Sequence, residues 1–199
     1  MWHLGSQAFL RVMEDDIQFK TVLDVGCGHG QHTKLFRDAG YEVTPIDHQA
    51  LFDGVVVMKY GMTPDDYYKK DGFDLVWTSH VLEHQMNTLT FLQCLKTDLK
   101  EGGWLVTTVP PLKPQIVGGH VTLWNAGLLL YNLVMAGFDC SKAKIKKYDY
   151  NISVIIQKRS VELPDNLHYD IGDIEKLAEF FPPPYRKQAF NGDIAEYNW

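Results

Sequence analysis

The stretch of sequence that decides the fold runs from residue 21 to residue 30 and reads Thr21-Val22-Leu23-Asp24-Val25-Gly26-Cys27-Gly28-His29-Gly30. Its first half is apolar apart from Thr21 and Asp24 and is typical of a buried strand, and its second half has a glycine at every second position. Glycine permits positive φ and a close approach to a ligand, and the helix expected next would add free main-chain N–H groups. The order strand, glycine loop, helix therefore predicts a ligand-binding loop. A dinucleotide fingerprint needs a glycine where Gln31 stands, so a dinucleotide site is not expected.

The rest of the chain alternates short apolar runs with helical patterns, which is typical of parallel strands joined by crossover helices. Further strands are expected at residues 41–46, 55–58, 73–78, 104–109, 143–148 and 152–157, and helices at 31–39, 87–99 and 125–136. The last two strands are so close together that they must be antiparallel. The sequence therefore predicts an α/β fold with a three-layer, doubly wound, mostly parallel seven-stranded sheet that ends in an antiparallel hairpin.

Residues 158–199 fit this alternation poorly. They contain one expected helix at 171–181, followed by three prolines and scattered aromatic residues. We expect residues 1–157 to form one ligand-binding domain, including an N-terminal helical segment, and residues 158–199 to form an extension packed on it. The extension is interpreted as a packed tail, with a substrate cover or a homodimer contact as the alternatives.

Four motifs in order carry a resemblance to a known family. The stretch from Val22 to Gly30 resembles motif I of the class I S-adenosylmethionine-dependent methyltransferases. Asp47 ends the second expected strand, and residues 73–84 and 99–106 are similar to the family's strand-four and strand-five motifs. The resemblance covers about residues 20–157 and is to the small-molecule, methyltransferase type 11/12-like branch. It implies a Rossmann-like methyltransferase fold, S-adenosylmethionine as cofactor and methyl transfer to a small-molecule acceptor.

The resemblance also implies a cofactor-binding set. The glycines would pass under the methionine and ribose, Asp24 would face the methionine ammonium, and Asp47 would hold both ribose hydroxyls with His48 beside the adenine. The family's adenine-binding aspartate is missing, so this contact is expected from main chain at Gly61 or Met62. The complete expected set is Asp24, Gly26, Cys27, Gly28, Gly30, Asp47, His48, Gly61, Met62, Ser79 and His80.

A catalytic residue is harder to predict, because an activated methyl donor mainly requires alignment and exclusion of water. A general base is needed only if the acceptor loses a proton. His120 is the first candidate, since it lies in a glycine-flanked loop after the fifth strand and imidazole titrates near neutrality. Its alternative is a loop-ordering role. His80 is the second candidate. Trp77, Trp124 and Tyr131 are expected in the core, with an acceptor pocket as the alternative.

The sequence His80-Val81-Leu82-Glu83-His84 also fits the inverted zinc-protease pattern. Zinc binding by this pattern requires both histidines on one helix face and a third ligand further along the chain. Because His80 directly follows an expected strand, we expect no metal site here. His84 is then expected to begin a helix at the edge of the site or to pack structurally.

The 199 residues carry a net charge of −6, without the basic bias of a chain that binds nucleic acid in bulk. The lysines within residues 142–147 are interpreted as protection of an edge strand. Three cysteines without a pairing pattern indicate a reducing compartment, and neither a signal peptide nor a membrane span is expected. We therefore expect a cytoplasmic enzyme without nucleic-acid or membrane partners. The alternative is a catalytically silent S-adenosylmethionine-binding module that acts through a partner.

Overall fold

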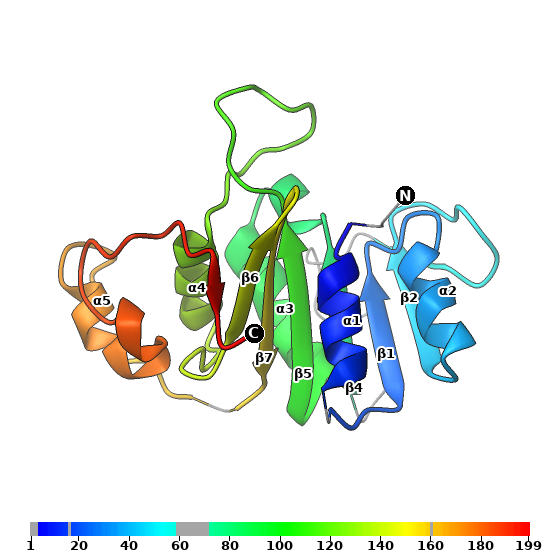
Figure 1. Cartoon of the computed structure of the whole chain (residues 1–199), viewed down its shortest axis with the longest axis horizontal. Coiled ribbons are helices and arrows are strands. Elements are labelled where there is room, and N and C mark those ends of the chain that lie inside the picture. The colour runs from blue at the N-terminus through cyan, green and yellow to red at the C-terminus, as the bar shows by residue number, and fades with distance from the viewer. Residues whose placement is uncertain (1–3, 16, 59–71, 160) are drawn as a thin grey trace.

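The computed structural model describes residues 4–15, 17–58, 72–159 and 161–199. These residues form an eight-stranded sheet with the order β3-β2-β1-β4-β5-β7-β6-β8 (Figure 1). Strands β1 to β5 are parallel, and β7, β6 and β8 each pair antiparallel with their neighbours. The bounds are β1 Thr21–Val25, β2 Glu42–Asp47, β3 Val56–Val57, β4 Phe73–Ser79, β5 Leu99–Val109, β6 Lys144–Tyr148, β7 Asn151–Gln157 and β8 Glu196–Tyr197. The mostly parallel α/β architecture with an antiparallel end is confirmed.

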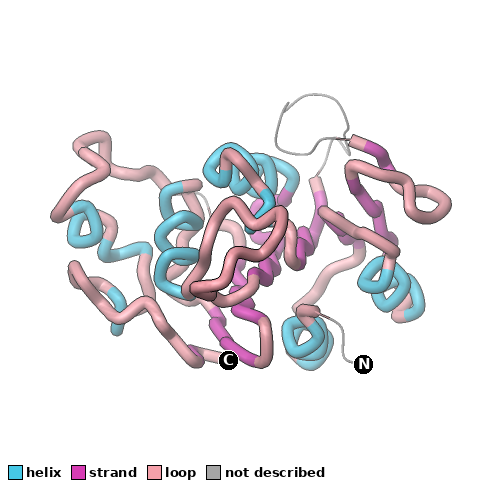
Figure 2. The backbone as a smooth tube through the Cα atoms, turned by 90° about the horizontal axis from the view of Figure 1, so that it is seen from above, coloured by secondary structure: helices cyan, strands magenta, loops and turns pink. Residues whose placement is uncertain are grey.

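Helices lie on both sides of the strands (Figure 2). Asn87 and Asn125 cap α3 and α4, each with its side-chain oxygen accepting a main-chain N–H three residues ahead. No helix in the described ranges is long and apolar enough to cross a membrane. The bounds are α1 Ser6–Glu14, α2 Gln31–Asp38, α3 Thr88–Asp98, α4 Ala126–Met135 and α5 Asp173–Lys176, with short 3-10 turns at Leu82–His84, Ala178–Phe180 and Pro183–Tyr185.

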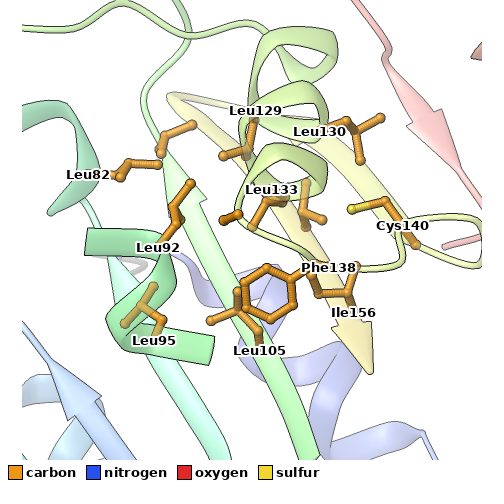
Figure 3. Close-up of a cluster of buried hydrophobic side chains, with 14 of the residues drawn as sticks. Leu82, Leu92, Leu95, Leu105, Leu129, Leu130, Leu133, Phe138, Cys140 and Ile156 are labelled. Atoms are coloured by element: carbon orange, nitrogen blue, oxygen red, sulfur yellow. The ribbon is translucent and has the colours of Figure 1, made fainter. Parts of the chain in front are cut away.

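The two faces of the sheet follow from the alternation of side chains along each strand. Val22 and Leu75 pack with Phe36 of α2 and with α1, whereas their neighbours Leu23 and Val76 belong to the cluster on the α3 and α4 side. Figure 3 shows leucines of α3 and α4 packed against strand residues on this second side. Both faces are therefore covered, and the strand ends are left to form a site.

The sheet has one strand more than expected. Strand β8 comes from the C-terminal extension and pairs with β6, so β6 is not an edge strand. The interpretation of its lysines as edge protection is wrong, because three of them are held in ion pairs across neighbouring segments. These pairs are Lys144–Asp15, Lys146–Glu196 and Lys147–Asp193.

The single helix expected at residues 171–181 is broken into α5 and a 3-10 turn. The helix starts only after Gly172, whose φ is +93°, and the carboxylate of Asp173 accepts the main-chain N–H groups of His168 and Tyr169. Beyond α5, Leu177 and Phe181 are buried in the same cluster as α4. The extension and the main sheet thus share one core in this structure, and a domain boundary at residue 157 stays a prediction.

Candidate active site and cofactor loop

The carboxyl ends of β1, β2, β4 and β5 meet at one edge of the sheet. In the strand register Val25 lies beside Ile46 on one side and Thr78 on the other, and Ser79 lies beside Thr108. The glycine loop, Asp47, His80 and the loop after β5 follow these positions directly. Most of the expected site residues therefore gather at this edge. Gly61 and Met62 lie outside the described residues, so the expected adenine contact stays a prediction.

The glycine loop is fastened to the end of β2. Gly26 and Cys27 both donate their N–H groups to the carbonyl of Ile46, at 2.8 and 3.0 Å. Gly28 donates its N–H to Oδ2 of Asp47 at 2.8 Å, and Gly30 donates to the carbonyl of Cys27 at 2.8 Å. These four N–H groups are satisfied within the protein. The free N–H groups expected here belong to the start of α2, which follows these residues, so the loop itself offers a ligand its surface.

Two of the loop glycines are required for different reasons. Gly26 has φ +76°, and a Cβ there would lie 2.1 Å from Cγ2 of Val81, so only glycine allows the loop to pack on the segment after β4. Gly28 has φ +50°, but a Cβ there would meet nothing within 4 Å. The space beside Gly28 is open, and a ligand can approach the backbone there.

Asp47 presents a largely buried carboxylate beside this open space. Its Oδ2 accepts from Gly28, and its Oδ1 accepts from the N–H of Gln49 at 3.3 Å and lies 2.7 Å from Nδ1 of His48. A carboxylate oxygen has two acceptor lone pairs, so Oδ2 keeps one for a ligand hydroxyl. The His48 ring is mostly exposed, with 71% of its side-chain surface accessible.

Asp24 lies beneath the loop and is tied to helix α2. Its Oδ2 accepts the Oγ1–H of Thr33 at 2.5 Å, and the residue is only 2% exposed. Burial raises the pKa of Asp24 to about 6, Asp47 adds to the rise, and the hydrogen bonds from Thr33 oppose it. In this structure the carboxylate joins β1 to α2. Nearby, burial raises the pKa of the Cys27 thiol to about 12, so the thiol stays protonated.

His80 directly follows β4 in a left-handed backbone conformation, with φ +57°. Its N–H donates to the carbonyl of Thr108 at 2.9 Å, and its Nε2 lies 3.0 Å from Oδ1 of Asn151. The same Asn151 oxygen accepts the N–H of Gly5 at 3.1 Å. Asn151 thus joins the N-terminal segment to the end of β4. Nothing in the sequence marked it as a site residue, because its partners lie 71 and 146 positions away.

Glu83, His84 and His120 form a second group at this edge. The carbonyl of Glu83 accepts the N–H of Val121 at 2.8 Å, which holds the loop after β5 against the 3-10 turn. The rings of His84 and His120 meet edge to face with centroids 4.9 Å apart. The sequence pattern paired His80 with His84, whereas the structure brings His120 to His84 and buries Glu83 completely. Glu83 was not among the expected site residues.

The candidate acceptor-pocket aromatics separate into two groups. Trp77 is fully buried and packs on Phe36 and on His32, and Trp124 is 2% exposed, so both are core residues as expected. Tyr131 instead lines a cavity of about 400 Å³ between α4 and the extension.

A family model described as a methyltransferase domain matches residues 5–126, which include the N-terminal helix, the glycine loop and the loop after β5. The chain belongs to the methyltransferase-domain family. The expected methyltransferase class is confirmed at the level of this family, and S-adenosylmethionine is the cofactor named for solved proteins of similar fold.

Two sequence relatives extend the comparison beyond the family model. A tRNA U34 carboxymethyltransferase of Alteromonas mediterranea is 26% identical over 84% of this chain and 59% of its own length. The corresponding protein of Colwellia psychrerythraea is 27% identical over 86% of this chain and 61% of its own length. This methyltransferase-family chain therefore spans about three fifths of the length of these curated relatives.

Solved methyltransferases share the fold. A SAM-dependent methyltransferase from Archaeoglobus fulgidus superposes with a TM-score of 0.61 at 19% identity, over 76% of this chain and 92% of the other. The 1,6-didemethyltoxoflavin-N1-methyltransferase of Burkholderia thailandensis, with bound S-adenosylhomocysteine, gives 0.60 at 17% identity, over 77% of this chain and 75% of the other. The expected Rossmann-like methyltransferase fold is confirmed.

One expectation about partners is wrong. A small-molecule acceptor and no nucleic acid were expected, but the sequence relatives are named tRNA U34 carboxymethyltransferases. Net charge describes only the averaged field of the molecule. A single unstacked base can be recognised by stacking and hydrogen bonds at one edge, without a broad basic surface. A cytoplasmic location stays a prediction.

Proposed function

We propose that this methyltransferase transfers the methyl group of S-adenosylmethionine to a nucleoside of a tRNA. The geometric observation that supports cofactor binding concerns Gly28 and Asp47. Open space beside Gly28 adjoins the Asp47 carboxylate, which can accept a further hydrogen bond from a ligand. The support for the acceptor is the similarity to tRNA U34 carboxymethyltransferases over 84% and 86% of the chain.

The residues present fit S-adenosylmethionine. Asp47 would accept from the ribose hydroxyls, since its carboxylate ends β2 at the rim of the open space beside Gly28. The Asp24 carboxylate would face the ammonium group of the cofactor's methionine, directly or through water. The main chain at Ser79 and His80 would border the methionine end. When bound, the cofactor supplies an activated methyl group, so the protein has to align the acceptor and exclude water.

The loop after β5 offers a surface for a base. In Figure 1 this segment extends beyond the strand ends, and it exposes large apolar side chains, with Leu112 52% and Ile116 95% accessible. Nζ of Lys113 lies 3.9 Å from the centre of the Tyr150 ring. Unpaired bases stack on aromatic and apolar side chains, and a nearby cation suits the adjoining phosphate. This loop would therefore receive the acceptor nucleoside.

His120 is better placed than His80 to act on the acceptor. Both ring nitrogens of His80 already have neighbours, Asn151 at 3.0 Å and Glu83 at 3.3 Å. His120 is half-buried on the acceptor loop, and the ring it meets is that of His84. We infer that His120 is the histidine that assists removal of the acceptor proton, where the acceptor has one to lose.

The first test separates cofactor binding from transfer. Calorimetry with S-adenosylmethionine and S-adenosylhomocysteine measures binding, and mass spectrometry of nucleosides from tRNA incubated with enzyme and cofactor measures transfer. We expect binding of both compounds and one methylated nucleoside. Binding without any modified nucleoside, for tRNA pools lacking the modification, would contradict the tRNA acceptor and favour the silent module. A parallel incubation replaces S-adenosylmethionine with an analogue that carries a carboxymethyl group on the sulfonium sulfur. A carboxymethylated nucleoside formed only in that incubation would keep tRNA as the acceptor and change the donor.

A variant identifies the role of His120. His120→Ala should keep cofactor binding and lower the rate of tRNA modification by about 100-fold, the usual contribution of a positioned proton acceptor. The exposed His168 provides the matched control, because its replacement by alanine removes a histidine from the extension only. Equal rates of tRNA modification by the His120 and His168 variants would contradict the proton-accepting role and indicate that His120 only orders the loop.

A further inference from the structure

We propose that Glu83, His84 and one ring nitrogen of His120 form a binding site for a divalent transition-metal ion at the carboxyl edge of the sheet. A ligand atom from each of these residues lies within 4.8 Å of the other two. The inverted zinc-protease pattern in the sequence has a different set, with His80 and His84 as ligands and a third ligand further along the chain. The proposal does not depend on which acceptor the enzyme modifies.

The first observation is the environment of the Glu83 carboxylate. The side chain is completely buried, and neither carboxylate oxygen accepts a hydrogen bond from any described residue. Its near neighbours are Nδ1 of His80 at 3.3 Å and Nε2 of His84 at 3.8 Å, both measured to Oε1. A buried carboxylate without hydrogen bonds is costly by several kcal/mol unless a cation compensates it. The carboxylate of Glu83 therefore needs a positive partner.

The second observation is the tautomer of His84. Its Nδ1 lies 2.7 Å from the carbonyl oxygen of Gly119, and a carbonyl can only accept a hydrogen bond. Nδ1 must therefore carry the proton. In the neutral ring, Nε2 then carries a lone pair on the side of Glu83. Histidine ligands in metal sites have this arrangement, in which one nitrogen donates to a carbonyl and the other is left for the ion.

His80 supports the same conclusion from the opposite side of Glu83. Because Oδ1 of Asn151 accepts the N–H of Gly5, that atom is an oxygen, and Nε2 of His80 must donate to it. In the neutral ring, Nδ1 of His80 then carries a lone pair 3.3 Å from Oε1 of Glu83. Two imidazole lone pairs thus adjoin one buried carboxylate. A cation bound near the Glu83 carboxylate would be stabilised by it and by the two imidazole lone pairs. Protonation of the histidine rings is the alternative way to compensate the carboxylate.

The third ligand arrives with the loop after β5. The N–H of Val121 donates to the carbonyl of Glu83, so His120 is held beside the turn that carries the other two ligands. Ligands of one zinc ion at about 2.1 Å lie about 3.4 Å apart, so closure needs a side-chain movement of about 1 Å. The His84 side chain is 44% exposed, which leaves an entry path from solvent.

The ligand set defines the class of ion and its use. Two imidazoles and one carboxylate suit Zn²⁺, Fe²⁺ or Co²⁺ and leave coordination positions open, whereas Mg²⁺ prefers oxygen ligands alone. The cluster adjoins Val81, whose side chain packs on Gly26 of the cofactor loop. An acceptor oxygen in an open position would be held at the edge where transfer occurs. A His120 nitrogen that binds the ion has no lone pair left for a proton, so the direct proton-accepting role inferred for His120 applies to the enzyme without the ion.

The test is direct measurement of metal binding to the full chain. Protein stripped with a chelator is titrated with Co²⁺ and, separately, with Zn²⁺ and Mg²⁺, and binding is followed by calorimetry and by the visible absorption of bound Co²⁺. We expect one Co²⁺ or Zn²⁺ per chain and much weaker binding of Mg²⁺. Absence of Co²⁺ and Zn²⁺ binding up to about 1 mM would overturn the proposal and leave the histidine rings protonated against Glu83.

Variants locate the ion. His84→Ala and His120→Ala should each weaken Co²⁺ binding by more than about tenfold, and Glu83→Gln should do the same while keeping the shape of the buried side chain. His168→Ala, at an exposed histidine of the extension, should bind Co²⁺ as the parent does. Unchanged binding in His84→Ala or in His120→Ala would contradict the proposed set. Because binding is measured without turnover, a failed metal test and a failed tRNA test are separate results.

Discussion

Oδ2 of Asp47 accepts the main-chain N–H of Gly28 at 2.8 Å. The carboxylate expected to hold the cofactor ribose therefore also holds the glycine loop. The two residues are 19 positions apart and come from the ends of neighbouring parallel strands. A change at either residue is therefore expected to affect both the conformation of the glycine loop and cofactor binding. Substitutions at Gly28 and at Asp47 separate these two effects.

Gly28→Ala should abolish cofactor binding at a modest cost in stability. The new Cβ would meet no protein atom, so the cost is the positive φ of +50°, about 1–2 kcal/mol. The same Cβ would occupy the open space that we assign to the cofactor. Gly40→Ala is the matched control, because Gly40 has φ +91° and equally open surroundings but lies after α2, away from the site. Similar binding of S-adenosylhomocysteine by both variants would place the cofactor elsewhere.

Asp47→Ala should weaken S-adenosylhomocysteine binding by about tenfold or more, since it removes the ribose acceptor and leaves the Gly28 N–H unpaired. Asp47→Asn keeps one acceptor oxygen and should lose less. The exposed Asp53 serves as the control, with Asp53→Ala expected to bind as the parent does. Calorimetry measures all three variants. Parent-like affinity in Asp47→Ala would exclude the ribose role.

Asp24 should make the folded chain less stable as the pH rises. Its pKa in the folded protein is about 6, against an ordinary value of 3.8, because burial disfavours the charged carboxylate. Between these values the folded state binds more protons than the unfolded state, so the free energy of unfolding falls as the pH rises. The loss is absent below pH 4, complete above about pH 6 and amounts to about 3 kcal/mol.

Asp24→Asn removes this titration and keeps an acceptor for Thr33. Urea unfolding between pH 4 and pH 7 should therefore show a flatter pH dependence for the variant than for the parent. Equal slopes for the two proteins would show that Asp24 is not held protonated by burial.

Asn151→Ala should lower the free energy of unfolding by about 1–3 kcal/mol, because it leaves the buried Gly5 N–H and one donor of His80 without their acceptor. The N-terminal segment should also become more sensitive to limited proteolysis, since Gly5 is the N-cap residue of α1. Thermal or urea unfolding measures the first effect. Asn191→Ala, at an exposed asparagine, should stay within about 0.5 kcal/mol of the parent. Similar losses in both variants would contradict the joining role of Asn151.

Local patterns were enough for the central strands and for the cofactor loop. Residues 21–30 predicted a buried strand followed by a glycine loop because burial on both faces produces a mostly apolar run, and positive φ favours glycine. The end of β2 at Asp47 was predicted in the same way. These features depend on neighbours in sequence. The broken helix after Gly172 and the strand β8 were missed, because burial of Leu177 and Phe181 and pairing with β6 decide them.

The sequence by itself determined the α/β class, the family and the position of the glycine loop, since each of these depends on motifs of contiguous residues with a fixed spacing. Only the tertiary structure decided what surrounds Glu83. His84 is its neighbour in the chain, whereas His120 arrives through a loop held by the Glu83 carbonyl, and Asn151 orients His80 from β7. Side chains far apart in sequence converge because parallel strands end at one edge, and no local spacing encodes that meeting.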